Sequence, residues 1–139
     1  PPLICRKLLH TPFPVTSPAF YLIDGIKVDI VNYKYPWLDE VVLKQGIRMA
    51  SFKDIAAMKI TAVVGRGTKK DFIDIAFLLR HFSLDEILSF YSLKYNDGSI
   101  FMAMKSLAYF DDAENEPMPD MFVNQSWEQI KEYILSKIS

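Results

Sequence analysis

Hydrophobic and polar positions in the first third of the chain follow the short period of β-strands. Two runs rich in β-branched and aromatic residues, AFYLI (19–23) and IKVDIV (26–31), are separated only by an Asp-Gly dipeptide. Asp-Gly readily takes the positive-φ positions of a two-residue hairpin turn. Because side chains alternate between the two faces of a strand, Lys27 and Asp29 are expected to share one face. The pattern therefore predicts an antiparallel hairpin.

The next segment predicts one short helix and one short strand. YPWLDEVVLK (35–44) places Pro36 in the first turn of a helix, where its missing N–H costs no hydrogen bond. GIRMA (46–50) indicates a short strand after its glycine. Beyond residue 50 the hydrophobic pattern becomes helical.

Four helix starts beyond residue 50 show a capping-box pattern, a hydroxyl residue followed three positions later by an acid or amide. The pairs are Ser51 with Asp54, Thr68 with Asp71, Ser83 with Glu86, and Ser126 with Gln129. They predict helices at about 52–64, 69–81, 84–94 and 127–138, with another near 99–109 after the turn residues Asn96-Asp97-Gly98. The acidic, proline-containing segment 111–122 predicts a loop.

Two charged residues interrupt the apolar runs of the first two helices. The helix over 52–64 is apolar nearly all round, as buried helices are, so the ammonium of Lys59 must snorkel, pair or face a cleft. In the next helix Asp71 has a local explanation, because an acid in the first turn complements the helix dipole. Asp74 lies beyond that turn and lacks this explanation. Lys59 and Asp74 are therefore candidates either for a site or for an ion pair.

The connector GRGTKK (65–70) joins these two helices and concentrates positive charge. Gly65 suits the C-terminal cap of the first helix, while Arg66, Lys69 and Lys70 lie beside the N-terminus of the second. Because a helix N-terminus attracts anions, this corner is a candidate for contact with phosphate. It is no Walker loop, since the G-x-x-x-x-G-K-[ST] spacing is absent.

Composition narrows the class of protein. The 139 residues are 50% hydrophobic, which fits one globular domain, and 16 Lys plus Arg nearly balance 17 Asp plus Glu. The chain therefore has no overall positive electrostatic field that would attract it to nucleic acid or to an anionic membrane. The single cysteine, Cys5, excludes an intrachain disulfide framework and a multi-cysteine zinc site. No apolar stretch reaches the ~18 residues of a membrane span, so a cytoplasmic protein without membrane contact is expected.

Four segments, taken in order, carry a resemblance to a known family. They are IKVDI, GIRMASFKDIAAMK, GRGTKKDFIDIAFLL and SLAYFDDAENEPMP. They contain a D-x-x-x-x-K motif that ends at Lys59 and an R-x-x-x-K-D-x-x-D motif that runs from Arg66 to Asp74. Over about residues 20–120 the chain resembles the AbiEii/AbiGii-type nucleotidyltransferase toxin family, a branch of the minimal nucleotidyltransferase superfamily.

The resemblance implies nucleotide-binding roles for several charged residues of these motifs. Lys59 would contact the triphosphate, Arg66 and Lys70 would be further nucleotide-binding cations, and Asp71 would support them. Such cations stabilise the charge on phosphates during nucleotidyl transfer. The implied substrate is a nucleoside triphosphate (NTP), and tRNA is the acceptor of some toxins of the family.

The resemblance also implies two catalytic aspartates and a metal. Asp74 would support catalysis, and Asp29 matches the third superfamily carboxylate, where it would be one ligand of a Mg²⁺ site. The family's opening motif, a Gly-Ser loop followed by D-x-D, is missing, and the chain contains no aspartate pair at i and i+2. The metal site is therefore expected to be incomplete, with no tightly bound Mg²⁺.

The expected fold class is α+β, a truncated nucleotidyltransferase-like fold with short N-terminal strands followed by a helical bundle. Residues 1–50 would be a remnant of the nucleotidyltransferase sheet and residues 51–139 the helical part of the same single domain. Because the chain opens on Pro1 and not on methionine, a fragment of a longer protein is expected. The leading hypothesis is the C-terminal part of an AbiEii-like enzyme that transfers a nucleoside monophosphate to an acceptor, inactive as this chain alone.

Two alternatives stay open at this point. One is a degenerate member of the fold that acts as an interaction module and pairs through open strand edges. An antitoxin protein or a second copy of the chain, in a homo-oligomer, would be its partner. The other alternative makes Lys59 and Asp74 a buried ion pair that belongs to no active site.

Overall fold

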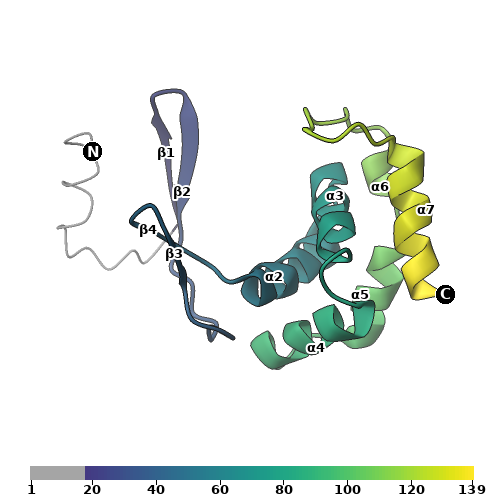
Figure 1. Cartoon of the computed structure of the whole chain (residues 1–139), viewed down its shortest axis with the longest axis horizontal. Helices are drawn as coiled ribbons and strands as arrows, with labels where there is room; N and C mark the ends of the chain where they lie inside the picture. Colours follow the sequence, from purple (N-terminus) through teal and green to yellow (C-terminus); the bar gives the residue numbers. More distant parts are fainter. Residues whose placement is uncertain (1–17) are drawn as a thin grey trace. The chain divides into compact units, whose positions relative to one another are not determined.

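Four short strands precede six helices in the computed structural model, which describes residues 18–139 (Figure 1). The strands are β1 (Ala19–Ile23), β2 (Ile26–Ile30), β3 (Val42–Lys44) and β4 (Ile47–Met49). The helices are α2 (Phe52–Gly65), α3 (Lys69–Leu78), α4 (Leu84–Lys94), α5 (Ile100–Leu107), α6 (Asp111–Glu114) and α7 (Trp127–Ile138). The chain divides into two compact units, Pro1–Lys34 and Tyr35–Ser139. The predicted α+β class, with strands before helices, is confirmed.

The first unit contains the predicted hairpin. β1 and β2 pair antiparallel around a tight turn, in which Asp24 and Gly25 have φ values of 49° and 79°. Lys27 and Asp29 share one face of β2, with 3.4 Å between Nζ and Oδ2. Both the hairpin and the predicted facing of these side chains are therefore confirmed. Cys5 lies outside the described residues.

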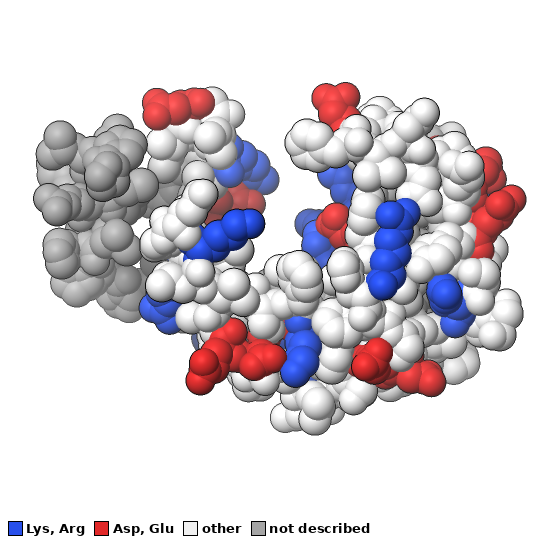
Figure 2. Space-filling view, in the orientation of Figure 1, with Lys and Arg blue, Asp and Glu red and all other residues white. Residues whose placement is uncertain are grey.

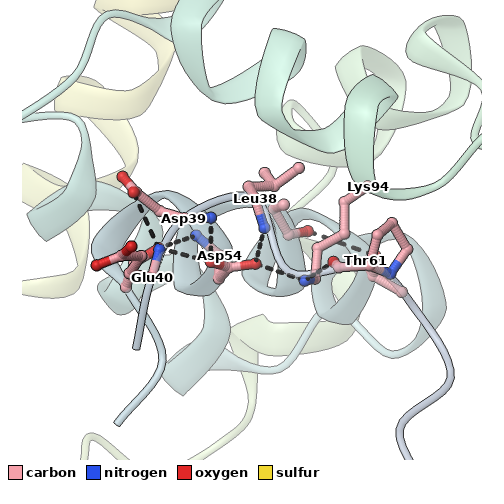
Figure 3. Close-up of polar contacts among 9 residues, drawn as sticks. Leu38, Asp39, Glu40, Asp54, Thr61 and Lys94 are labelled. Carbon is pink, nitrogen blue, oxygen red and sulfur yellow. Dashed lines mark hydrogen bonds and ion pairs between the residues drawn. The ribbon is translucent and has the colours of Figure 1, made fainter. Parts of the chain in front are cut away.

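The second unit begins with a loop where the sequence predicts a short helix. In a helix the carbonyl of Pro36 would accept the N–H of Glu40. Instead, this carbonyl accepts from Lys94 Nζ at 2.7 Å, and the N–H of Glu40 donates to Oδ1 of Asp39 at 3.0 Å (Figure 3). The helix prediction is wrong because the carbonyl of Pro36 and the N–H of Glu40 bind side chains and not each other. Strand β3 follows the loop, inside the segment predicted as a helix, and pairs with β4, which confirms only the strand predicted after Gly46.

The helices beyond residue 50 lie where the sequence predicts them. The ends of α2, α4, α5 and α7 differ from the prediction by at most two residues. α3 ends earlier, at Leu78, where the N–H groups of Arg80 and His81 donate to the carbonyls three residues before them and not to those four residues before them. The segment predicted as a loop over 111–122 begins instead with the short helix α6. This part of the prediction is wrong because the buried side chains of Phe110 and Ala113 fix the start of the segment to the core.

Helix α2 is the centre of the helical unit. It packs against α3, α4 and α5, and α3 packs in turn against α7 (Figure 1). Ala56 and Ala57 have no exposed surface, and their small side chains allow neighbouring helices to approach α2 closely. On α3, the ring of Phe72 lies 4.8 Å from that of Phe110 and 6.0 Å from that of Trp127. The core therefore fixes α2 and α3, the two helices that carry the candidate residues.

A fully buried ion pair fixes the N-terminus of α2. Oδ1 of Asp54 lies 2.6 Å from Nζ of Lys94 on α4, and neither side chain has exposed surface (Figure 3). Asp54 also accepts from the hydroxyl of Ser51 at 2.6 Å and from the N–H of Leu38 at 2.9 Å. Burial would raise the pKa of Asp54, but the hydrogen bonds from Lys94 and Ser51 outweigh burial and hold this pKa below its ordinary value. The ring of Trp37 lies 4.8 Å from the Lys94 ammonium.

We expect Lys94→Met to lower the free energy of unfolding by about 3–5 kcal/mol, because it leaves the Asp54 carboxylate buried without a counter-charge. Guanidinium denaturation of both proteins measures the change. Lys53→Met is the control, since Lys53 pairs with Asp39 at the surface, where both side chains are about half exposed. The control is expected to lose far less stability, and equal losses in the two variants would contradict the anchoring role of Lys94.

Candidate functional site

The candidate residues of α2 and α3 meet where these two helices pack together. Lys59 extends its ammonium from α2 to Asp74 on α3, with 2.6 Å between Nζ and Oδ2. The same Nζ lies 3.7 Å from Oδ1 of Asp71. The two acids are three positions apart and therefore lie on the same face of α3. One lysine thus bridges both acids of the K-D-x-x-D segment.

Asp71 is the buried anchor of this group. Arg66, directly after α2, binds its carboxylate through two hydrogen bonds, Nε to Oδ2 at 2.8 Å and Nη2 to Oδ1 at 2.9 Å. The hydroxyl of Thr68 donates to Oδ2 at 2.6 Å. Burial would raise the pKa of Asp71, but the hydrogen bonds from Arg66 and Thr68 prevail and lower this pKa to about 2. Asp71 is therefore ionised at neutral pH and ties the connector to the first turn of α3.

Lys59, Arg66, Asp71 and Asp74 form one group, named here the Lys59 cluster. It contains two cations and two carboxylates. The side chain of Asp71 is fully buried, whereas those of Lys59 and Asp74 are 28% and 44% exposed. The predicted Lys59–Asp74 ion pair is therefore present but partly exposed and not buried, and the hypothesis that the pair belongs to no active site stays open. The Lys59 side chain is thus partly exposed to solvent while its ammonium is held by the two acids.

The predicted phosphate corner at the N-terminus of α3 is occupied by the chain's own acidic segment. The N–H of Lys69 donates to Oε2 of Glu116 at 2.6 Å. The Lys69 ammonium is buried and donates to the carbonyls of Glu114 and Glu116 at 3.1 and 2.6 Å. It also lies 4.9 Å from the ring of Trp127. Lys69 is thus a structural contact, and Lys70, which is exposed, is the lysine of this corner that a ligand can reach.

Asp29 lies in the first unit, where its carboxylate pairs with Lys27. Within residues 18–139, no group of three or more His, Cys, Asp or Glu side chains is arranged to hold a metal ion. The incomplete Mg²⁺ site and the catalytic roles of Asp29 and Asp74 stay predictions.

The surface charge of the helical unit is mixed. On the face drawn in Figure 2, its Lys and Arg side chains are interspersed with acidic and uncharged residues. This distribution agrees with the formal net charge of -1 for the whole chain. Attraction of an anion to the helical unit therefore depends on local groups of charged side chains. None of the described helices combines the length and the apolar character that crossing a bilayer requires.

Comparison with known proteins supplies a family for these residues. A family described as "Nucleotidyl transferase AbiEii toxin, Type IV TA system" matches residues 21–137. An uncharacterized protein of Aquifex aeolicus (strain VF5) is 38% identical over 122 residues, which cover 85% of this chain and 58% of that protein. The chain thus spans little more than half the length of this relative. No solved structure matches the chain.

The low pKa of Asp71 predicts a pH-dependent contribution to stability. Folding lowers this pKa from 3.8 to about 2, so the ionised carboxylate stabilises the fold above pH ~4, and this contribution disappears as the pH falls toward 2. Asp71→Asn lacks the titrating group. We expect the stability difference between wild type and variant to shrink by roughly 2 kcal/mol from about pH 5 to pH 2, as measured by urea denaturation. A difference that stays constant over this range would contradict the assignment.

Proposed function

This chain belongs to the AbiEii nucleotidyl transferase toxin family, and from that premise we propose that it supplies the phosphate-contacting part of a nucleotidyltransferase site. The observation that carries the proposal is the Lys59 cluster, in which the lysine of the family motif is held at the surface between α2 and α3. Nucleotidyl transfer needs cations positioned on the phosphates of the NTP. Lys59, Arg66 and Lys70 are the proposed cations.

Lys59 and Arg66 have the hydrogen-bonding capacity for this role. The Lys59 ammonium has three donors, and Asp74 accepts at 2.6 Å while Asp71 lies farther away at 3.7 Å. Arg66 directs Nε and Nη2 to Asp71, and the guanidinium carries further N–H groups on Nη1. A phosphate oxygen that approaches from solvent would therefore find donors without breaking the bonds that hold the connector.

The reaction proposed for the complete enzyme is transfer of a nucleoside monophosphate from an NTP to an acceptor, with tRNA as one candidate. The acceptor oxygen would form a bond to the α-phosphorus, the bond to pyrophosphate would break, and the acceptor hydroxyl would lose its proton to a base. Asp29 is the proposed carboxylate for activation of that hydroxyl, with Asp74 in support. Mg²⁺ is the expected metal of the complete family site, and its main carboxylate ligands are absent from this sequence.

One observation favours a second function, that of an interaction module. Within the described residues, both sheets have only two strands, and the β3–β4 hairpin exposes Leu43 and Ile47. Isolated two-stranded hairpins are only marginally stable, and open edges can accept a further strand. The family name refers to a toxin–antitoxin system, so an antitoxin is the proposed partner, with a second copy of this chain as the other candidate.

We expect Lys59→Met to weaken NTP binding by roughly tenfold or more, because a hydrogen bond from a charged group is worth about 1.5–3 kcal/mol. Isothermal titration calorimetry on the 139-residue chain measures the affinity, and thermal unfolding shows that the variant is folded. Lys53→Met is the matched control, since it removes a lysine of the same helix that pairs with Asp39 outside the cluster. Equal effects of the two substitutions would contradict the proposed contact.

We expect the 139-residue chain alone to transfer no labelled nucleotide to tRNA or protein. The D-x-D carboxylates that hold the metal in the family are absent from its sequence. Incubation with radiolabelled NTPs and tRNA, followed by gel separation, tests this expectation. Measurable incorporation that Lys59→Met abolishes would contradict it.

A further inference from the structure

We infer that the groove between α2 and α3 beside Lys59 binds the base of the nucleoside triphosphate. The groove is lined by Phe52, Ile55 and Lys59 of α2, by Asp74 and Phe77 of α3, and by His81 just beyond α3. Lys59 and Asp74 belong to the Lys59 cluster, so the groove begins at the proposed phosphate site. The inference therefore rests on the proposed function. It adds a binding place for the base, which the phosphate contacts do not assign.

The size and lining of the groove fit one flat ring system with a charged tail. Its volume is about 260 Å³, slightly below the ~300–1,000 Å³ of sites that enclose a drug-sized ligand. A single base fits this space better than a whole nucleotide does. Apolar and aromatic side chains dominate the lining, while the Lys59 ammonium provides a cation beside them. An NTP divides in the same way, into an aromatic base and an anionic triphosphate.

Phe52 offers the ring on which the base would stack. Phe52 is 58% exposed, although it is a large apolar residue at the start of α2. Its ring centroid lies 5.7 Å from that of His81, which leaves too little room for a base between the two rings. Arg80 lies over the ring of Phe77, 4.7 Å from its centroid, so Phe77 has one face already covered. The base would therefore stack on Phe52, with Phe77 and Ile55 as walls of the groove.

The test compares ligands with and without a base. Each of the four common NTPs and inorganic tripolyphosphate are titrated into the folded 139-residue chain by calorimetry. Phe52→Ala is expected to weaken NTP binding about tenfold, as loss of a stacked aromatic ring does, and to leave tripolyphosphate binding unchanged. Phe101→Ala is the matched control, because it removes a 75% exposed phenylalanine from α5, away from the groove, and neither ligand is expected to respond.

The outcomes separate the groove from the phosphate site. Selective loss of NTP affinity in Phe52→Ala supports the base groove. If wild type binds both kinds of ligand and Phe52→Ala weakens both equally or weakens neither, the base groove is overturned while the phosphate site stands. If wild type binds neither NTPs nor tripolyphosphate, the proposed function fails, and the base groove fails with it.

Discussion

The buried ion pair between Asp54 and Lys94 is the interaction on which the helical unit depends. A carboxylate removed from water must find partners, since its desolvation costs several kcal/mol. The partners of Asp54 come from α4, from Ser51 and from the loop before β3, so one side chain fastens three segments at the start of α2. The position of α2 is thereby fixed at one end. Because α2 carries Lys59, the candidate site depends on a contact that lies outside it.

A second buried acid, Asp71, is held by hydrogen bonds at the start of α3 in the same way, and it belongs to the Lys59 cluster. Arg66 and Thr68 satisfy its carboxylate, so Lys59 makes only a longer contact with it and a short one with the partly exposed Asp74. The buried acid positions the cations, while the Lys59–Asp74 pair remains within reach of a ligand. Donors that are positioned before the ligand arrives reduce the free-energy cost of ordering on binding. The same arrangement therefore explains both the stability of the connector and its proposed affinity for phosphate.

Local signals in the sequence predict most of the secondary structure, because capping residues and the Asp-Gly turn act over a few positions. The motif spacing also marks Lys59 and Asp74 as a candidate pair before any fold is known. Prediction fails where distant groups compete: the helix near Pro36 is lost because Lys94, 58 residues away, takes its carbonyl. No local pattern marks Lys94 as buried, and none reveals that Lys69 would be held by the acidic segment. Such contacts depend on packing between helices.

The role of Lys59 is tested most directly by NMR of the chain labelled with ¹³C at the lysine ε-carbons. The Lys59 resonance is assigned by its absence from the spectrum of Lys59→Arg, and the labelled protein is titrated with an NTP. A phosphate held by the Lys59 ammonium predicts a saturable shift of this resonance, while that of Lys53, on the same helix but paired with Asp39, stays in place. An unchanged Lys59 resonance at saturating NTP would contradict the proposed site.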